Sequence, residues 1–89
     1  MIYKTKEGDV DLSRLVRLYA AGIVEMQSEQ AEMSLEWIEM YAERIRVVEY
    51  VLVFDSTLPS EDVKNRVVLR FETKDALLAE MAEVAKLFA

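Results

Sequence analysis

An acid at the tip of a buried strand is a common position for a catalytic carboxylate, and Asp55 stands at such a position. It ends the apolar run over residues 47–54 and precedes Ser56 and Thr57. In phosphate-transfer enzymes such an acid works at the carboxyl edge of a parallel sheet, with a glycine-rich loop beside it. This chain has two glycines and no such loop. We therefore predict that Asp55 ends a strand and bonds to the backbone of the following loop.

Glu49, within the same apolar run, is the second carboxylate with possible chemistry. A carboxylate buried beside aromatic surface is suited to acid–base catalysis. The tyrosines that could assist it are Tyr19, Tyr41 and Tyr50. The structural interpretation makes Glu49 an ion-pair partner of Arg66 or Arg70 on a neighbouring strand. We keep a small enzyme or ligand-binding protein that uses Glu49 or Asp55 as the alternative function.

A third pattern resembles the start of a calcium loop, because Asp9, Asp11 and Ser13 occupy alternate positions. Such a loop requires glycine at its sixth position and glutamate at its twelfth, where this chain has Arg14 and Ala20. The chain also lacks histidine and cysteine, the commonest metal ligand and the thiolate nucleophile. We predict no metal and no cofactor, with Asp9 or Asp11 finishing a turn and capping the next element.

The composition indicates a small domain with more apolar side chain than it can bury alone. The chain has 89 residues, of which 53% are hydrophobic, against about 45–50% in a typical soluble domain. A single domain of this size, spanning residues 1–89, buries only roughly 60–65% of the surface of its unfolded chain. We therefore expect apolar surface to be covered by a protein partner or a second copy.

The net charge of −6 disfavours binding to a phosphate backbone. Nucleic-acid binding through Arg44, Arg46, Arg66 and Arg70 is the weaker alternative to their pairing with carboxylates. No apolar run approaches the about 20 residues that span a bilayer, and the first residues lack the long apolar stretch of a signal peptide. The prediction is a cytoplasmic protein with no membrane or nucleic-acid partner.

The pattern of apolar residues predicts the α+β class: a small single-domain sandwich in which helices cover one face of a short antiparallel sheet. Strands are predicted near residues 2–6, 47–55 and 66–72, and helices near residues 11–26, 29–46 and 74–88. The last two strands should pair antiparallel. Thr73 should cap the last helix, whose buried stripe should consist of Leu77, Met81, Val84 and Phe88, widened by Leu78 and Ala85.

The segment over residues 11–26 allows two interpretations. Leu12, Leu15, Val16, Tyr19, Ala20 and Ile23 follow the spacing of one helical face. The same segment can be a strand, with Val16, Leu18, Ala20, Val24 and Met26 on one face. The helix is favoured, because the strand would carry a second apolar face. The order of elements is then β-α-α-β-β-α, and with the strand it becomes β-β-α-β-β-α.

The segment over residues 29–46 is predicted as one helix capped by Ser28. Six glutamates at spacings of three and four would align on one side of it: Glu25, Glu29, Glu32, Glu36, Glu39 and Glu43. A flank of Met and aromatic residues would lie beside the helix's own core stripe: Met26, Met33, Trp37, Met40 and Tyr41. This Met/Trp flank is either part of the core or an exposed partner surface, since Met adapts its shape and Trp anchors.

The function predicted from these observations is a non-catalytic protein–protein interaction module or homodimer that uses the Met/Trp flank.

Overall fold

The computed structural model describes residues 1–62 and 64–88. The chain begins with strands β1 (Ile2–Thr5) and β2 (Gly8–Asp11), followed by a 3₁₀ turn, η1 (Leu12–Arg14). Strands β3 (Arg17–Met26) and β4 (Glu29–Ser34) precede the short helix α1 (Leu35–Met40). The chain then forms β5 (Arg46–Asp55), β6 (Arg66–Phe71) and helix α2 (Lys74–Lys86).

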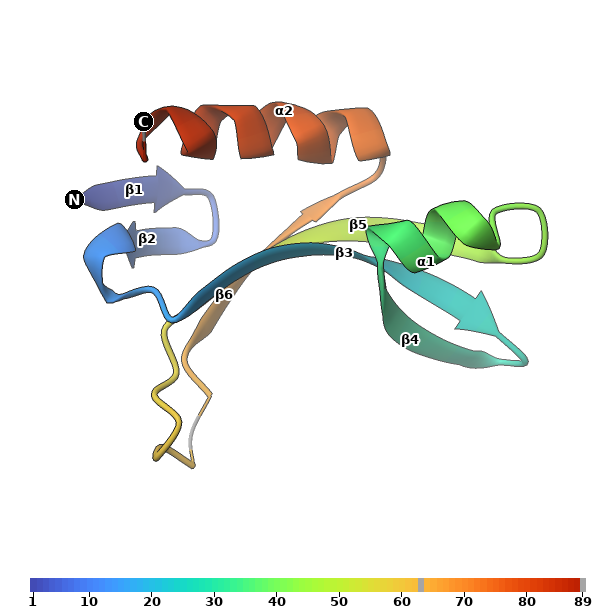
Figure 1. Cartoon of the computed structure of the whole chain (residues 1–89), viewed down its shortest axis with the longest axis horizontal. Helices are drawn as coiled ribbons and strands as arrows, with labels where there is room; N and C mark the ends of the chain where they lie inside the picture. Colours follow the sequence, from blue (N-terminus) through green and yellow to red (C-terminus); the bar gives the residue numbers. More distant parts are fainter. Residues whose placement is uncertain (63, 89) are drawn as a thin grey trace.

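The main sheet has four antiparallel strands in the order β4-β3-β5-β6, and β1 pairs with β2 in a separate two-stranded sheet. Figure 1 shows α1, α2 and the β1–β2 hairpin on the same side of the main sheet. Among the described residues, no helix or hairpin covers the opposite side, which we call the open face. Its apolar centre consists of Ala21, Val51 and Val53, with Tyr19, Ile23 and Val68 packed around them.

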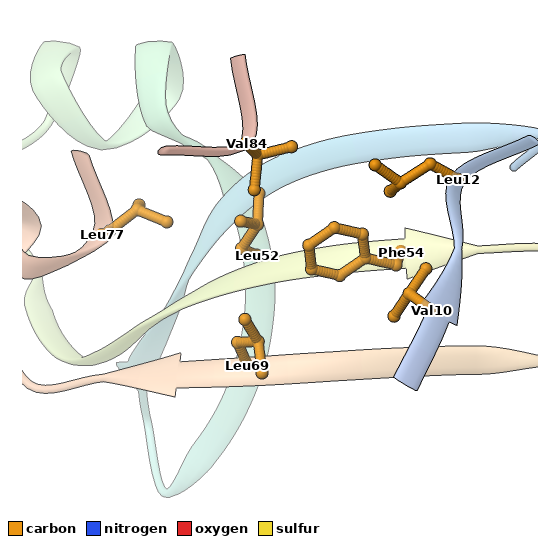
Figure 2. Close-up of a cluster of buried hydrophobic side chains, with 7 residues drawn as sticks. All are labelled: Val10, Leu12, Leu52, Phe54, Leu69, Leu77 and Val84. Carbon is orange, nitrogen blue, oxygen red and sulfur yellow. The ribbon is translucent and has the colours of Figure 1, made fainter. Parts of the chain in front are cut away.

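The core lies between the sheet and the elements on its covered side. Leu77 and Val84 of α2 are almost fully buried against Leu52 of β5, and Figure 2 shows these three side chains together. Phe54 packs beside Val10 and Leu12, which come from β2 and η1. The hairpin and α2 therefore together bury the covered side of β5.

Local side-chain bonds begin both helices. The hydroxyl of Thr73 accepts the N–H of Ala76 at the start of α2, and the hydroxyl of Ser34 accepts the N–H of Trp37 at the start of α1. Each bond satisfies an N–H group that has no partner within the first helical turn. The cap predicted at Thr73 is confirmed.

The two helices are also joined to each other by an ion pair, in which Lys74 Nζ lies 2.6 Å from Glu39 Oε1. This exposed contact lowers the pKa of Glu39 and raises that of Lys74, mainly through the hydrogen bond between them. It connects the end of α1 to the first turn of α2.

The predicted fold class is wrong, because the chain is richer in strands than a short sheet covered by two or three helices. The predicted helix over residues 11–26 is in fact η1 followed by β3, one of the two central strands. A central strand is apolar on both faces when both are covered by side chains. Ala20 packs toward α2 while Ala21 and Ile23 pack on the open face, and this two-sided pattern resembles the spacing of a helix.

The predicted helix over residues 29–46 is also wrong in most of its length. Residues 29–34 form β4, and only residues 35–40 are helical. The proposed cap Ser28 instead lies in a two-residue turn, where Gln27 and Ser28 have φ of 47° and 72°. Positive φ at both positions belongs to the hairpin turn that matches the twist of paired strands. The alternation of Ala31 and Met33 with polar residues was the local signal for a strand.

The remaining elements agree with the sequence. The strands predicted over residues 47–55 and 66–72 are β5 and β6, and they pair antiparallel. Val67, Leu69 and Phe71 point to the covered side, and Val68 points to the open face. The strand predicted over residues 2–6 exists as β1, but it does not join the main sheet. Gly8, at the turn between β1 and β2, has φ of 131°, a conformation that glycine adopts readily.

Candidate functional site

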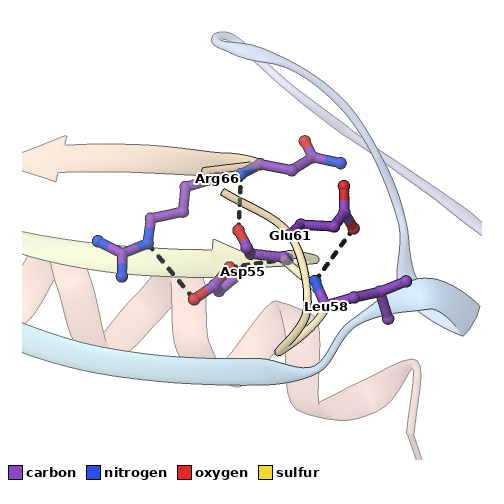
Figure 3. A network of polar contacts seen from close by, with 6 residues as sticks. Asp55, Leu58, Glu61 and Arg66 are labelled. Carbon is purple, nitrogen blue, oxygen red and sulfur yellow. Dashed lines mark hydrogen bonds and ion pairs between the residues drawn. The ribbon is translucent and has the colours of Figure 1, made fainter. Parts of the chain in front are cut away.

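Asp55 stands at the strand-tip position that a catalytic acid often occupies, and its contacts are those of a structural residue. It ends β5 with 5% of its surface exposed. One carboxylate oxygen accepts the N–H of Thr57 at 2.9 Å, and the other lies 3.4 Å from Nε of Arg66 on β6. Figure 3 shows this network at the start of the loop. The Thr57 bonds, supported by the Arg66 charge, hold the pKa of Asp55 below its usual range.

These contacts fit the predicted structural role of Asp55, which ends its strand and bonds to the loop backbone. A carboxylate whose charged form is stabilised in this way is a poor general base, because the proton it would take is disfavoured.

Glu49 forms an ion pair with Arg70 on β6, which is one of the two partners predicted for it. The pair lies on the open face, where Arg70 of β6 is directly opposite Val51 of β5. Neither Glu49 nor Asp55 lines the apolar groove described below. Within the described part of the chain, no three acidic side chains converge closely enough to hold a metal ion.

The arginines considered for nucleic acid are mostly engaged with carboxylates. Arg66 contacts Asp55, Arg70 contacts Glu49, and Arg46 lies 3.9 Å from Glu25. These contacts offset the positive charge of β6 within the sheet itself, so that no strongly basic surface arises there.

The structure separates the residues of the predicted Met/Trp flank. Met26 ends β3 and Met33 lies in β4, while Trp37, Met40 and Tyr41 stay together at α1. The rings of Trp37 and Tyr41 pack together with centroids 4.7 Å apart and their planes tilted by 38°. Met40 is 76% exposed and Tyr41 38%. We call these three residues the α1 cluster. The glutamates Glu36, Glu39 and Glu43 surround it in sequence.

A different apolar surface lies beside α2, where a groove of about 390 Å³ runs along the line at which the helix meets the sheet. The helix contributes Met81, Val84 and Ala85, with Phe88 just beyond its end. The sheet contributes Leu18, Tyr19 and Ala20 of β3 and Leu52 of β5. The lining residues that the structure describes include no charged side chain.

The sequence prediction missed this groove because it assigned both apolar stripes of the last helix to the core. Leu77 and Val84 are buried as expected, but Leu78 is 43% exposed and Phe88 57% exposed. Only one face of a helix can lie against a sheet, so the apolar residues on the neighbouring face of α2 remain exposed. The signal for an exposed apolar surface was the width of the apolar arc on this helix. It exceeds the stripe of ≳100° that burial of one side requires.

The molecule also exposes more surface than its size requires. Its accessible surface is 6445 Å², whereas a compact monomer of the same mass exposes about 5,400 Å². Its radius of gyration is 14.1 Å, against about 12 Å for a compact domain of this length. The excess of about 1,000 Å² exceeds the about 800 Å² that each partner buries in a standard interface.

Among the described residues, neither helix is both long and apolar enough to cross a bilayer. The chain matches no protein-family model, and no curated protein or solved structure is significantly similar to it. Its function must therefore be inferred from its own surfaces.

Proposed function

We propose that the protein is a non-catalytic interaction module that works as a homo-oligomer, most simply a homodimer. The observation that supports this proposal is the excess of exposed surface together with the uncharged groove beside α2. Exposed or half-buried apolar side chains gathered at such a groove, among them Phe88 and Met81, are typical of a surface that is buried against a partner. The cytoplasmic location predicted from the sequence remains part of the proposal.

The contacts of the two candidate carboxylates support a binding role over catalysis. Asp55 is tied to Thr57 and Arg66, and Glu49 is tied to Arg70. A catalytic group must reach the substrate with its proton available, and both side chains already bond to neighbours in the sheet. Among the described residues that line the groove, none carries a carboxylate that could take their place.

Sedimentation velocity of the purified chain across the micromolar range tests the proposal. We expect a species of twice the monomer mass of 10.3 kDa, and its fraction should rise with protein concentration. A single species of monomer mass at every concentration would contradict it.

The α1 cluster is a second candidate for a contact surface, because Met40 is the most exposed large apolar side chain among the described residues. Its acidic surroundings favour a partner with basic groups around an apolar centre. This surface would serve a different protein, since two copies of it would bring their glutamates together. Capture of a basic amphipathic peptide by the wild type, and its loss in Met40→Glu, would support this second role.

A further inference from the structure

We infer that the groove beside α2 is occupied by α2 of a second copy, with the two helices antiparallel across a two-fold axis. The inference rests on the homo-oligomer proposed above and adds which surface makes the contact and which element fills it. Three apolar surfaces compete for this role, and their charges and burial distinguish them.

The open face is the first competitor, and its apolar centre is already covered. Val51 and Val53 are 1% and 2% exposed. The ion pairs Arg66–Asp55 and Arg70–Glu49 lie beside these valines on the same face. A second copy docked here would gain little apolar area. It would also bury these charged side chains, and desolvating ion pairs is costly.

The α1 cluster is the second competitor, and its charge opposes contact with itself. A two-fold interface brings the same patch of both copies together. Glu36 and Glu43, which flank the cluster in sequence, would then come close to their own copies, and like charges in contact cost several kcal/mol. The lining of the groove beside α2, as far as the structure describes it, carries no such charge.

The shape of the groove suits a helix. Four strands about 4.8 Å apart make a sheet that is wide enough for two helices of about 10 Å diameter side by side. On the covered side, α2 occupies one of these places. The second helix, α1, has only six residues and packs where Gly22 leaves room for it. The start of β3, at Leu18 and Ala20, is left beside α2 without a helix over it.

The exposed stripe of α2 can pack against its own copy. It consists of the half-buried Met81 and the exposed Leu78, Ala82 and Ala85, which fall on one side of the helix at about 100° per residue, and Phe88 follows just beyond the helix end. The large residues Leu78 and Phe88 lie at its ends, five positions on either side of Glu83. An antiparallel pair centred near this position therefore places Leu78 of each copy beside Phe88 of the other. The alanines between them allow the helix axes to approach closely.

The test uses cysteine substitutions, because the natural chain has no cysteine. Ala82→Cys places a thiol beside the proposed axis. Ala76→Cys is the matched control, since Ala76 is also an exposed alanine of α2 but lies away from the stripe, near the other end of the helix. On mild oxidation, we expect Ala82→Cys to form a covalent dimer much faster than Ala76→Cys. Circular dichroism of both variants checks that they remain folded.

A pair of charge substitutions provides the second readout. Phe88→Glu and Met40→Glu each replace an exposed apolar side chain, one at the groove and one in the α1 cluster. We expect Phe88→Glu to raise the dissociation constant of the dimer by at least about tenfold, the effect of about 1.4 kcal/mol. Met40→Glu should leave it unchanged.

The outcomes separate the inference from the function on which it rests. If the wild type is a dimer but Ala82→Cys cross-links no faster than Ala76→Cys, the inference is overturned and the homo-oligomer still stands. The same holds if Met40→Glu is the variant that dissociates. A monomeric wild type would overturn both. Preferential cross-linking at Ala82 together with dissociation by Phe88→Glu would establish the helix pair.

Discussion

Gly22 of β3 lies directly beneath Ile38 of α1, and a Cβ atom at Gly22 would overlap Cδ1 of Ile38. Ile38 is 7% exposed, so that it cannot swing into solvent without losing its packing. Because Gly22 has no side chain, α1 can pack closely against the sheet.

Gly22→Ala should destabilise the protein by about 1–3 kcal/mol, the usual cost of adding a methyl group to a packed site. The double variant Gly22→Ala/Ile38→Val removes the overlapping Cδ1 and should recover much of this loss. Urea unfolding of the two single variants and the double variant measures the coupling. If Gly22→Ala is as stable as the wild type, the close packing of α1 on β3 is refuted.

The two serines on either side of β4 should respond oppositely to substitution. Ser28 has φ of 72°, a conformation that glycine adopts without cost. Ser28→Gly should therefore raise the free energy of unfolding by up to about 1 kcal/mol. Ser34→Ala removes the cap at Trp37 and should lower it by about 0.5–2 kcal/mol. Thermal and urea unfolding report both changes, and a destabilised Ser28→Gly would contradict the turn.

Asp55→Asn should make the protein less stable at neutral pH, and the difference from the wild type should shrink in acid. The pKa of Asp55 is lower in the folded chain than its ordinary value of 3.8. The stability it contributes is therefore present above that value and disappears as the pH falls toward the folded-state pKa, from about pH 5 downward. Urea midpoints at a series of pH values measure this.

Asp62→Asn is the control for this experiment, because Asp62 is an exposed loop aspartate. It should follow the wild type throughout. An Asp55→Asn variant that stays below the wild type by the same margin in acid would show that the loss comes from packing and not from the charge.

Tyr3 should be the last tyrosine to ionise, because burial and its hydrogen bond to Glu80 raise its pKa to about 12. The raised value means that Tyr3 contributes stability below its ordinary pKa of 10.0, and this contribution is lost as the pH rises toward 12. The ultraviolet absorbance of tyrosinate follows the titration. Tyr3→Phe should remove the latest step and leave the earlier ones, whereas loss of a step near pH 10 would contradict the assignment.

Helix α2 and strands β5 and β6 could be predicted from the sequence because their signals are local. Thr73 supplies a cap next to the helix it begins. The alternation of Val67, Leu69 and Phe71 with polar and charged neighbours follows the period of a strand. The roles of Asp55 and Glu49 were also accessible, since each bonds to residues of the adjacent loop or strand.

Strand β3 could not be assigned because its place in the sheet depends on a distant partner. Residues of β3 pair with β5, as Leu18 does with Phe54, across a long stretch of sequence. The six glutamates follow helical spacing, yet Glu25 lies in β3, Glu32 in β4 and Glu39 in α1. A spacing of three and four is also what two strands and a turn can present by chance, and it outweighed the local alternation of Ala31 and Met33 in β4.

The amino-acid sequence alone determined that the chain is acidic, lacks histidine and cysteine, and carries more apolar side chain than its size can bury. Only the tertiary structure decided where that apolar surface lies. The local pattern shows how many apolar faces an element has, but the packing of distant elements decides which of them is covered. In α2 the sheet covers the stripe of Leu77 and Val84, and it leaves Leu78 and Phe88 outside.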